Sequence, residues 1–292
     1  MAVDRMIWKI ILDFIVLACV GFPLLALQLW ATPFRRGYFE NDESIRLPYR
    51  EQSISEAVLG VAGFVFIIVT VIIIEVVRDK RGKGIGEKFL CGSVFPGWVW
   101  ESYVTIGVYT FGAACQQLTV NFAKYVLGRL RPSFYDVRRF SILCSLVCKP
   151  VPTPGSPQNA LGYIVDYTCQ GTDDALIQEF RLSFPSAHSS FAMYTAVFFI
   201  LLLQWKGKWR GSKLLRHVVQ FAALMAAWYA GLTRVVEHRH HWSDVGAGFL
   251  VGAAFGLVTF IYVLKPKNFG PALPPSWEIA QPEMLPRPVL VR

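Results

Sequence analysis

Residues 184–205 read FPSAHSSFAMYTAVFFILLLQW. The stretch opens with a proline, three serines and a histidine and continues as an apolar run. From residue 186 to residue 205 it has about the 20 residues that a helix needs to cross a bilayer. His188 therefore stands at the end of a predicted membrane helix. Because ionisable groups beside lipid are costly, this position predicts a functional role for the histidine.

The composition of the whole chain is that of a membrane protein with several spans. Of its 292 residues, 54% are hydrophobic and only 17% are charged, and the mean hydropathy is +0.41. A soluble domain has more charge and less apolar surface. We predict an all-α fold of six transmembrane helices in one domain, residues 1–264, followed by a Pro-rich cytoplasmic tail, residues 265–292. The predicted spans are 10–30, 57–77, 103–122, 186–205, 218–236 and 245–264.

The loops predict the orientation of these spans, because Lys and Arg accumulate on the cytoplasmic side. Residues 78–98 and 206–217 hold ten Lys or Arg in 33 positions, whereas residues 31–56, 123–185 and 237–244 hold twelve in 97. We therefore expect both termini in the cytoplasm, and the long loop 123–185 outside the cell or in a lumen. The plasma membrane is the first expectation for the localisation, and an internal membrane is the alternative.

Three clusters of ionisable residues stand at the outward ends of the predicted spans. In the first, 124–132, Lys124 and Arg131 are seven residues apart, so on a helix both lie on one face and can bind one anion. Pro132 would then end the helix. Arg129 would face away, toward solvent or lipid headgroups. Simple snorkelling of the cations at the interface is the alternative.

The second cluster, 184–190, opens the fourth predicted span. Pro185 and Ser186 are typical of the first residues of a helix, whose free N–H groups bind phosphate readily. His188 can hold the proton that a leaving alkoxide takes up. An ordinary serine-rich helix cap with a histidine at the interface is the competing interpretation.

The third cluster, 233–244, joins the fifth and sixth predicted spans and holds three histidines. Arg234 offers the planar fork that suits phosphate oxygens. Asp244 can orient one nitrogen of an imidazole and leave the other free to attack, and its spacing fits both His240 and His241. Three histidines also suit zinc, but the neighbouring arginines would repel a dication, so we predict no metal.

Taken together, Lys-x6-Arg-Pro, Pro-Ser-x-His and Arg-x5-His-x3-Asp on six spans resemble the type 2 phosphatidate phosphatase superfamily, specifically its lipid phosphate phosphatases. The resemblance extends to FAKYVLGRLRPSF, RLSFPSAHSSFAMY and HHWSDV and covers roughly residues 5–265. It implies His240 as the nucleophile, Asp244 as the residue that orients it, and His188 as the proton donor to the lipid alcohol. It implies a phosphate site made of Lys124, Arg131, Ser186, Ala187 and Arg234.

Two positions depart from the pattern of that family. Ala187 stands where glycine is usual and Thr233 where serine is usual. The methyl group of Ala187 would slow turnover if the backbone there were unusual, and would cost little in an ordinary helix start. Thr233 keeps the hydroxyl.

We therefore expect a phosphatase without metal or cofactor that hydrolyses lipid phosphate monoesters through a phosphohistidine. The resemblance implies phosphatidate, lysophosphatidate, sphingosine 1-phosphate and ceramide 1-phosphate as substrates. Membrane lipids are the other expected partners, nucleic acid is not one, and homo-oligomerisation is left open. A catalytically weak lipid-binding protein and a six-span transporter are the alternative functions.

Two smaller expectations concern single residues. Among the cysteines of the outer loop, we favour a disulfide between Cys148 and Cys169, because that loop lies in an oxidising compartment. Replacing Asp244 with Asn is expected to weaken turnover and to leave folding intact.

Overall fold

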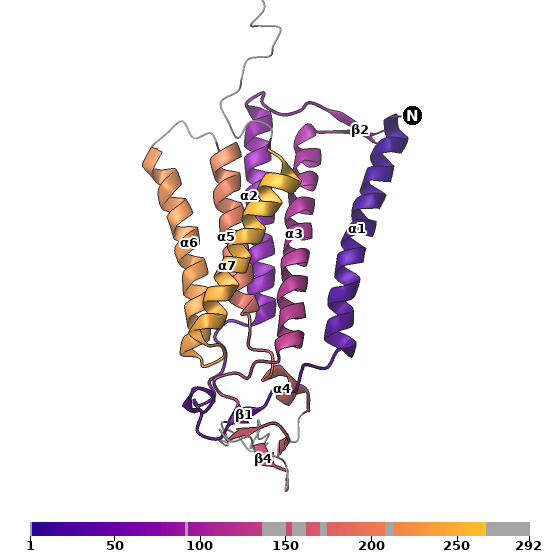
Figure 1. The fold of residues 1–292 in the computed structure, drawn as a ribbon. Coiled ribbons are helices and arrows are strands. Elements are labelled where there is room, and N and C mark those ends of the chain that lie inside the picture. The colour runs from indigo at the N-terminus through magenta and orange to yellow at the C-terminus, as the bar shows by residue number, and fades with distance from the viewer. Residues whose placement is uncertain are drawn as a thin grey trace, which may run out of the picture.

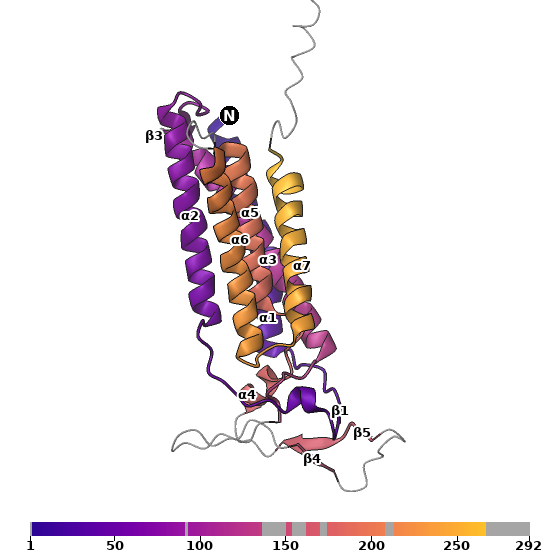
Figure 2. The ribbon, with the colours of Figure 1, turned by 90° about the vertical axis from the view of Figure 1, so that its left-hand side faces the viewer.

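A computed structural model describes residues 2–90, 93–135, 150–153, 162–169, 174–207 and 213–266. The long helices run side by side as one bundle, and both described ends of the chain lie at the same end of it (Figure 1, Figure 2). The mostly helical fold predicted from the sequence is confirmed. The long helices are α1 (Ala2–Trp30), α2 (Glu56–Lys80), α3 (Gly97–Leu127), α5 (Ala187–Lys206), α6 (Lys213–Val236) and α7 (Trp242–Val258), which continues into η2 (Thr259–Leu264).

Membrane-crossing length and apolarity are found in five segments of the described chain. They are Met6–Trp30, Glu56–Lys80, Ala187–Lys206, Leu214–Val236 and Trp242–Leu264. α3 is longer, but it buries polar side chains such as Gln116, Asn121 and Lys124 against its neighbours, so its sequence is less apolar. The sixth span, 103–122, therefore stays a prediction.

Aromatic residues fill the centre of the bundle between α2, α3, α5 and η2. Tyr109 on α3 and Tyr194 on α5 are fully buried and stack with ring centroids 5.2 Å apart. The Tyr194 hydroxyl donates to the Tyr109 carbonyl oxygen at 2.7 Å, and the Tyr109 hydroxyl lies 2.8 Å from Thr195 Oγ1. Buried Tyr hydroxyls need such partners, so these bonds fix how α3 and α5 meet.

Small residues bring α5 and α7 close together. A Cβ at Gly248 would collide with Ser189 Oγ, and a Cβ at Gly252 would collide with the Ser190 carbonyl oxygen. Small residues allow this kind of close approach between membrane helices. These glycines therefore have a packing role, which holds the beginning of α5 beside the beginning of α7.

A cap with its own apolar core covers one end of the bundle, at the bottom of Figure 1. β1 (Tyr38–Phe39) pairs antiparallel with β5 (Tyr163–Ile164), and β4 (Pro150–Pro152) pairs antiparallel with β6 (Tyr167–Cys169). Because β1 lies in the first loop, that loop contributes to the cap as well as residues 123–185. η1 (Glu43–Ile45) and α4 (Asp174–Glu179) complete the cap. Its core consists of Tyr38, Ile45, Leu130, Phe134, Ile164, Tyr167 and Phe180.

Some predictions fall wholly or partly on residues outside the described ranges. Cys169 is disulfide-bonded, but its predicted partner Cys148 lies outside the described residues. The same holds for residues 267–292 of the predicted tail.

The opposite end of the bundle carries a short hairpin and a cluster of buried charges. β2 (Lys88–Leu90) pairs with β3 (Ser93–Phe95). Nearby, Lys206 on α5 pairs with Glu75 on α2 and lies 3.2 Å from Glu101 on α3. Arg78 lies 2.9 Å from Glu75 and 2.7 Å from Glu101. Two cations and two carboxylates thus neutralise one another and tie three helices together.

Candidate active site

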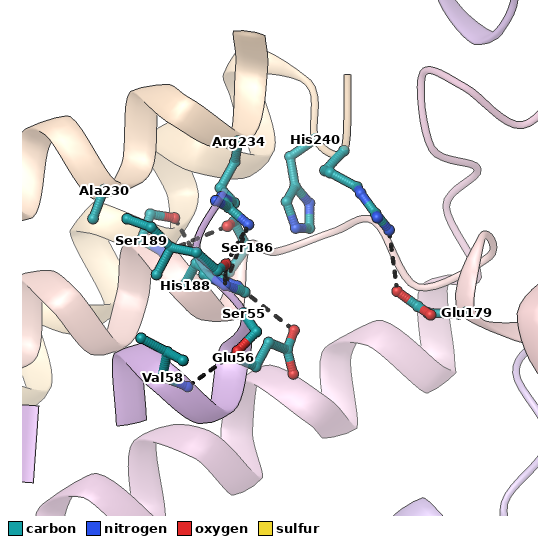
Figure 3. A network of polar contacts seen from close by, with 12 residues as sticks. Ser55, Glu56, Val58, Glu179, Ser186, His188, Ser189, Ala230, Arg234 and His240 are labelled. Carbon is teal, nitrogen blue, oxygen red and sulfur yellow. Dashed lines mark hydrogen bonds and ion pairs between the residues drawn. The ribbon is translucent and has the colours of Figure 1, made fainter. Parts of the chain in front are cut away.

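A polar cavity of about 320 Å³ lies where the cap meets the bundle. Side chains from α1, α2, α3, α4, α5 and α6 and from the loop before α7 line it. Figure 3 shows that His188, Arg234 and His240 lie close together there, although they are far apart in the sequence. Five of the predicted site residues line the cavity, namely Lys124, Arg131, His188, Arg234 and His240.

Lys124 and Arg131 reach this cavity from different backbone segments. α3 ends at Leu127, because Gly128 adopts the left-handed conformation with φ of 54° and its N–H bonds to the Lys124 carbonyl oxygen. A Cβ at position 128 would also collide with the Phe34 carbonyl oxygen, so only glycine fits. The prediction that one helix carries both cations is therefore wrong. The Arg131 N–H instead bonds to the Phe180 carbonyl oxygen at 2.9 Å.

The sequence predicts that Arg129 faces solvent or lipid headgroups, but its guanidinium points toward α7 and its side chain is only partly exposed. Its Nη1 donates to Asp244 Oδ1 at 2.5 Å and to Ser243 Oγ at 2.7 Å. Because the chain turns at Gly128, residue 129 points toward α7. Arg129 is thus the ion-pair partner of the buried Asp244.

The second cluster begins α5 as the sequence predicts. Ser186 is the N-cap, its side chain accepts from the Ser189 N–H, and Ala187 follows in the ordinary geometry of a helix start. Ser186 and Ala187 do not line the polar cavity, so their role in phosphate binding stays a prediction. His188 Nε2 lies 3.1 Å from the Ile54 carbonyl oxygen, so Nε2–H donates to that oxygen.

The Ile54 carbonyl oxygen also holds Arg234. Arg234 Nη1 donates to it at 3.0 Å, and Arg234 Nη2 lies 2.9 Å from Glu237 Oε2. The first loop therefore fixes both side chains, a contact that the sequence does not predict. With Nε2 bound, His188 Nδ1 is the nitrogen available for proton transfer.

A tight turn after α6 brings His240 back to the cavity. His238 has a positive φ of 55°, and the N–H groups of Arg239 and His240 both bond to the Arg234 carbonyl oxygen. His240 is buried, and its Nδ1–H donates to the Ser183 carbonyl oxygen at 2.7 Å. This bond selects the tautomer in which Nε2 has no proton and can act as a nucleophile.

The electrostatic surroundings of His240 keep its imidazole neutral. Burial, followed by the nearby charges of Arg131 and Lys124, lowers its pKa to about 3. The Asp244 carboxylate opposes this shift, but Asp244 Oδ2 is 3.9 Å from His240 Nδ1, beyond a hydrogen bond. Asp244 Oδ2 instead accepts from the Ser183 hydroxyl at 2.5 Å and lies 3.2 Å from His241 Nδ1.

His241 takes a different position from His240. It is the N-cap of α7, and its N–H donates to Asp244 Oδ2 at 3.0 Å. It does not line the cavity, which supports His240 as the nucleophile between the two candidates that the spacing left open. Within the described ranges, no group of three His, Cys, Asp or Glu side chains is arranged to hold a metal ion.

Three charged residues that the sequence did not assign also line the cavity. Arg239 is buried and lies 3.5 Å from Glu179 Oε1, which also pairs with Arg131 at 3.0 Å. Glu56, the first residue of α2, is the third. The lining therefore holds four cations and two carboxylates, an excess of positive charge that suits an anion. Of these three residues, only Arg239 could have been found from the sequence, because it lies in the third cluster and directly precedes His240.

Comparisons with known proteins show which family the sequence matches. A family model described as the PAP2 superfamily matches residues 105–267. A Drosophila melanogaster protein named "Putative phosphatidate phosphatase" is 39% identical over 89% of the chain and 69% of its own length. Phospholipid phosphatase 2 of Mus musculus is 37% identical over 91% of the chain and 89% of its own length. Phospholipid phosphatase 1 of the same organism is 36% identical over 86% of the chain and 83% of its own length. No solved structure gives a significant match.

Proposed function

Because the chain belongs to the PAP2 superfamily, it is a lipid phosphate phosphatase, and we propose that it hydrolyses lipid phosphate monoesters through a phosphohistidine on His240. The observation that carries this proposal is the Ser183 carbonyl oxygen at 2.7 Å from His240 Nδ1. It leaves Nε2 unprotonated in a cavity that is lined by cations. The substrates we propose are phosphatidate, lysophosphatidate, sphingosine 1-phosphate and ceramide 1-phosphate.

In the first step, the side chains of Lys124, Arg131 and Arg234 bind the nonbridging phosphate oxygens. His240 Nε2 attacks the phosphorus, the bond from phosphorus to the ester oxygen breaks, and protonated His188 gives its Nδ1 proton to the leaving alkoxide. Neutral His188 then accepts a proton from a water molecule, which attacks the phosphohistidine and releases inorganic phosphate. Positioning and charge stabilisation are the main demands of phosphoryl transfer, and these cations supply them without a metal ion.

Asp244 has a positioning role in this proposal. It is fully buried, and it binds Arg129, the Ser183 hydroxyl and the N–H of His241. These contacts hold the Ser183 carbonyl oxygen against His240. The ion pair with Arg129 also joins the segment after α3 to the beginning of α7.

The location of the site within the cell is also part of the proposal. The helices form an integral membrane protein, and the loops at the cavity end are poorer in Lys and Arg than those at the other end. By this asymmetry the cavity faces the extracellular or lumenal side and both termini face the cytoplasm. We propose the plasma membrane as the site of action.

The test is phosphate release from phosphatidate in detergent micelles that contain EDTA. The wild-type protein is expected to release phosphate, and His240→Asn is expected to reduce release to the uncatalysed background. His241→Asn is the matched control, because Asn is also a good N-cap for α7, and it should keep most of the activity. Full activity of His240→Asn would refute the assigned nucleophile, and a strict requirement for magnesium would refute the metal-independent mechanism.

A further inference from the structure

A second cavity of about 320 Å³ lies among α1, α2, α3 and α5, deeper in the bundle than the polar one. Apolar side chains and small residues dominate its lining, including Leu24, Leu59, Gly60 and Phe191. Glu56 and His188 line this cavity as well as the polar cavity, so the two cavities adjoin at these side chains. A lipid whose phosphate lies beside His240 can therefore place a hydrocarbon chain here.

The apolar cavity has room for part of one hydrocarbon chain. At about 30 Å³ for a water-sized group, its volume holds roughly ten methylene groups. A second acyl chain would have to leave between the helices toward the surrounding lipid. The occupant that this cavity favours is thus the single hydrocarbon chain of a lipid phosphate.

Glu56 stands where the two cavities meet. Its Oε1 lies 3.6 Å from His188 Nδ1, and its side chain is 61% exposed, so the carboxylate is accessible from the cavities (Figure 3). In the proposed reaction, His188 Nδ1 protonates the ester oxygen of the substrate. With the ester oxygen at His188 Nδ1, the carbon that bears the phosphate and the next carbon of the lipid lie near Glu56. A substituent on that second carbon is therefore next to the Glu56 carboxylate.

The chemistry of a carboxylate selects what this substituent can be. An ionised carboxylate only accepts hydrogen bonds, so it attracts an ammonium or hydroxyl group and repels the oxygens of an acyl ester. The lining of the polar cavity keeps more cations than carboxylates for the phosphate, and the exposed Glu56 carboxylate can contact another part of the substrate.

We propose that this chain selects single-chain lipid phosphates that carry a hydrogen-bond donor on the carbon next to the phosphate-bearing carbon, with Glu56 as the specificity-determining residue. This inference rests on the proposed function. Sphingosine 1-phosphate, with its ammonium group, matches best. Lysophosphatidate, with a hydroxyl, comes next, and phosphatidate, with an ester and two chains, matches least.

The experiment measures kcat/KM for these three lipids in micelles with EDTA. The wild-type protein should prefer sphingosine 1-phosphate to phosphatidate by about tenfold, and Glu56→Gln should reduce that preference, mainly through KM, because it removes the contact to the substituent and leaves the apolar cavity unchanged. Because Glu56 also faces His188, the variant can lower kcat for every lipid, so the ratio between lipids is the readout. Glu179→Gln is the matched control, because it removes the same charge from the polar cavity at a position outside the apolar one.

The outcomes separate the inference from the function on which it rests. An unchanged ratio in Glu56→Gln, or the same change in Glu179→Gln, would overturn the role of Glu56. Equal rates for all lipids with complete loss in His240→Asn would overturn the selectivity and leave the phosphatase function standing. Absence of hydrolysis for every lipid would overturn the proposed function itself.

A second variant tests the apolar cavity. Gly60 lines the apolar cavity and a Cβ there meets no atom within 4 Å, so the side chain of Gly60→Leu begins in open space and takes up part of the cavity. It should slow hydrolysis of long-chain substrates about tenfold relative to butyl phosphate. Gly21→Leu on α1 is the control, because its Cβ is equally free and it lines neither cavity. Equal slowing of both substrates by Gly60→Leu would exclude the cavity as the chain site.

Discussion

Replacing Asp244 with Asn tests how the proposed nucleophile is held in place. The carboxylate is fully buried and accepts hydrogen bonds from Arg129, Ser183 and the N–H of His241. An Asn side chain can keep its oxygen toward Ser183 and His241, but it then turns an NH₂ group toward the guanidinium of Arg129. Two donors would face each other, so the structure predicts a loss of stability as well as of turnover. The expectation of intact folding is thereby revised.

The magnitude follows from the bonds that change. A hydrogen bond to a charged group contributes about 1.5–3 kcal/mol, and the Arg129 side chain is 31% exposed, so solvent reduces that contribution. The two remaining bonds also weaken, because they lose a charged acceptor. We expect a total loss of about 2–3 kcal/mol, which corresponds to a decrease in Tm of roughly 4–10 °C for a protein of this size.

The assay is fluorescence-detected thermal unfolding of purified protein in detergent, for Asp244→Asn, Arg129→Gln and the double variant. If the two side chains form one pair, the double variant should lose about 1 kcal/mol less than the sum of the single variants. Phosphate release measured on the same preparations should decrease in both single variants. An Asp244→Asn protein that unfolds at the wild-type temperature would refute this reasoning.

Three further predictions concern other parts of the molecule. Burial lowers the pKa of His240 from 6.5 to about 3, so between these pH values His240 is protonated in the unfolded protein and neutral in the folded one. Lowering the pH through this range should therefore destabilise the wild-type protein by up to about 1.4 kcal/mol per pH unit more than His240→Asn. Unfolding measured at several pH values in phosphate-free buffer tests this. Lys206→Met leaves two carboxylates with one cation, and it should lower the free energy of unfolding by up to about 3 kcal/mol, with partial recovery in a double variant with Glu75→Gln. Gly252→Val should lower the free energy of unfolding by about 1–3 kcal/mol and should also lower turnover, because a Cβ there collides with the backbone of α5. Gly246→Val, whose Cβ meets no atom within 4 Å, should change neither quantity in thermal unfolding and phosphate-release assays.

The sequence predicts the helical bundle well, because long apolar runs have few alternatives to a helix in lipid. It also predicts that Lys124, Arg131, His188, Arg234 and His240 come together, since their predicted spans end on one side. These predictions need only local composition and the order of the spans.

Features that depend on contacts between distant segments could not be predicted in this way. The helix that should carry both first-cluster cations ends early, because the backbone of residue 34 approaches Gly128. Arg129 looked like a surface residue, since nothing in its neighbourhood indicates Asp244, 115 residues later. The backbone carbonyl oxygens of Ile54 and Ser183 select the tautomers of His188 and His240. Every residue has such an oxygen, so the sequence does not indicate which ones take part.

The face of α7 that packs against α5 is made of glycines, so residues far from the cavity can influence turnover. Gly248, Gly252 and Gly256 bring α7 against α5, and Asp244 and His188 lie in the first turns of these two helices. A methyl group added at one of these glycines would push α5 and α7 apart. It would thereby separate His188, the proposed proton donor, from Asp244, which positions the proposed nucleophile. A survey of inactivating mutations should therefore find sensitive positions outside the cavity. These positions follow one another at intervals of about one helical turn along α7, from the cavity toward the opposite membrane surface, and none of them contacts the phosphate of the substrate.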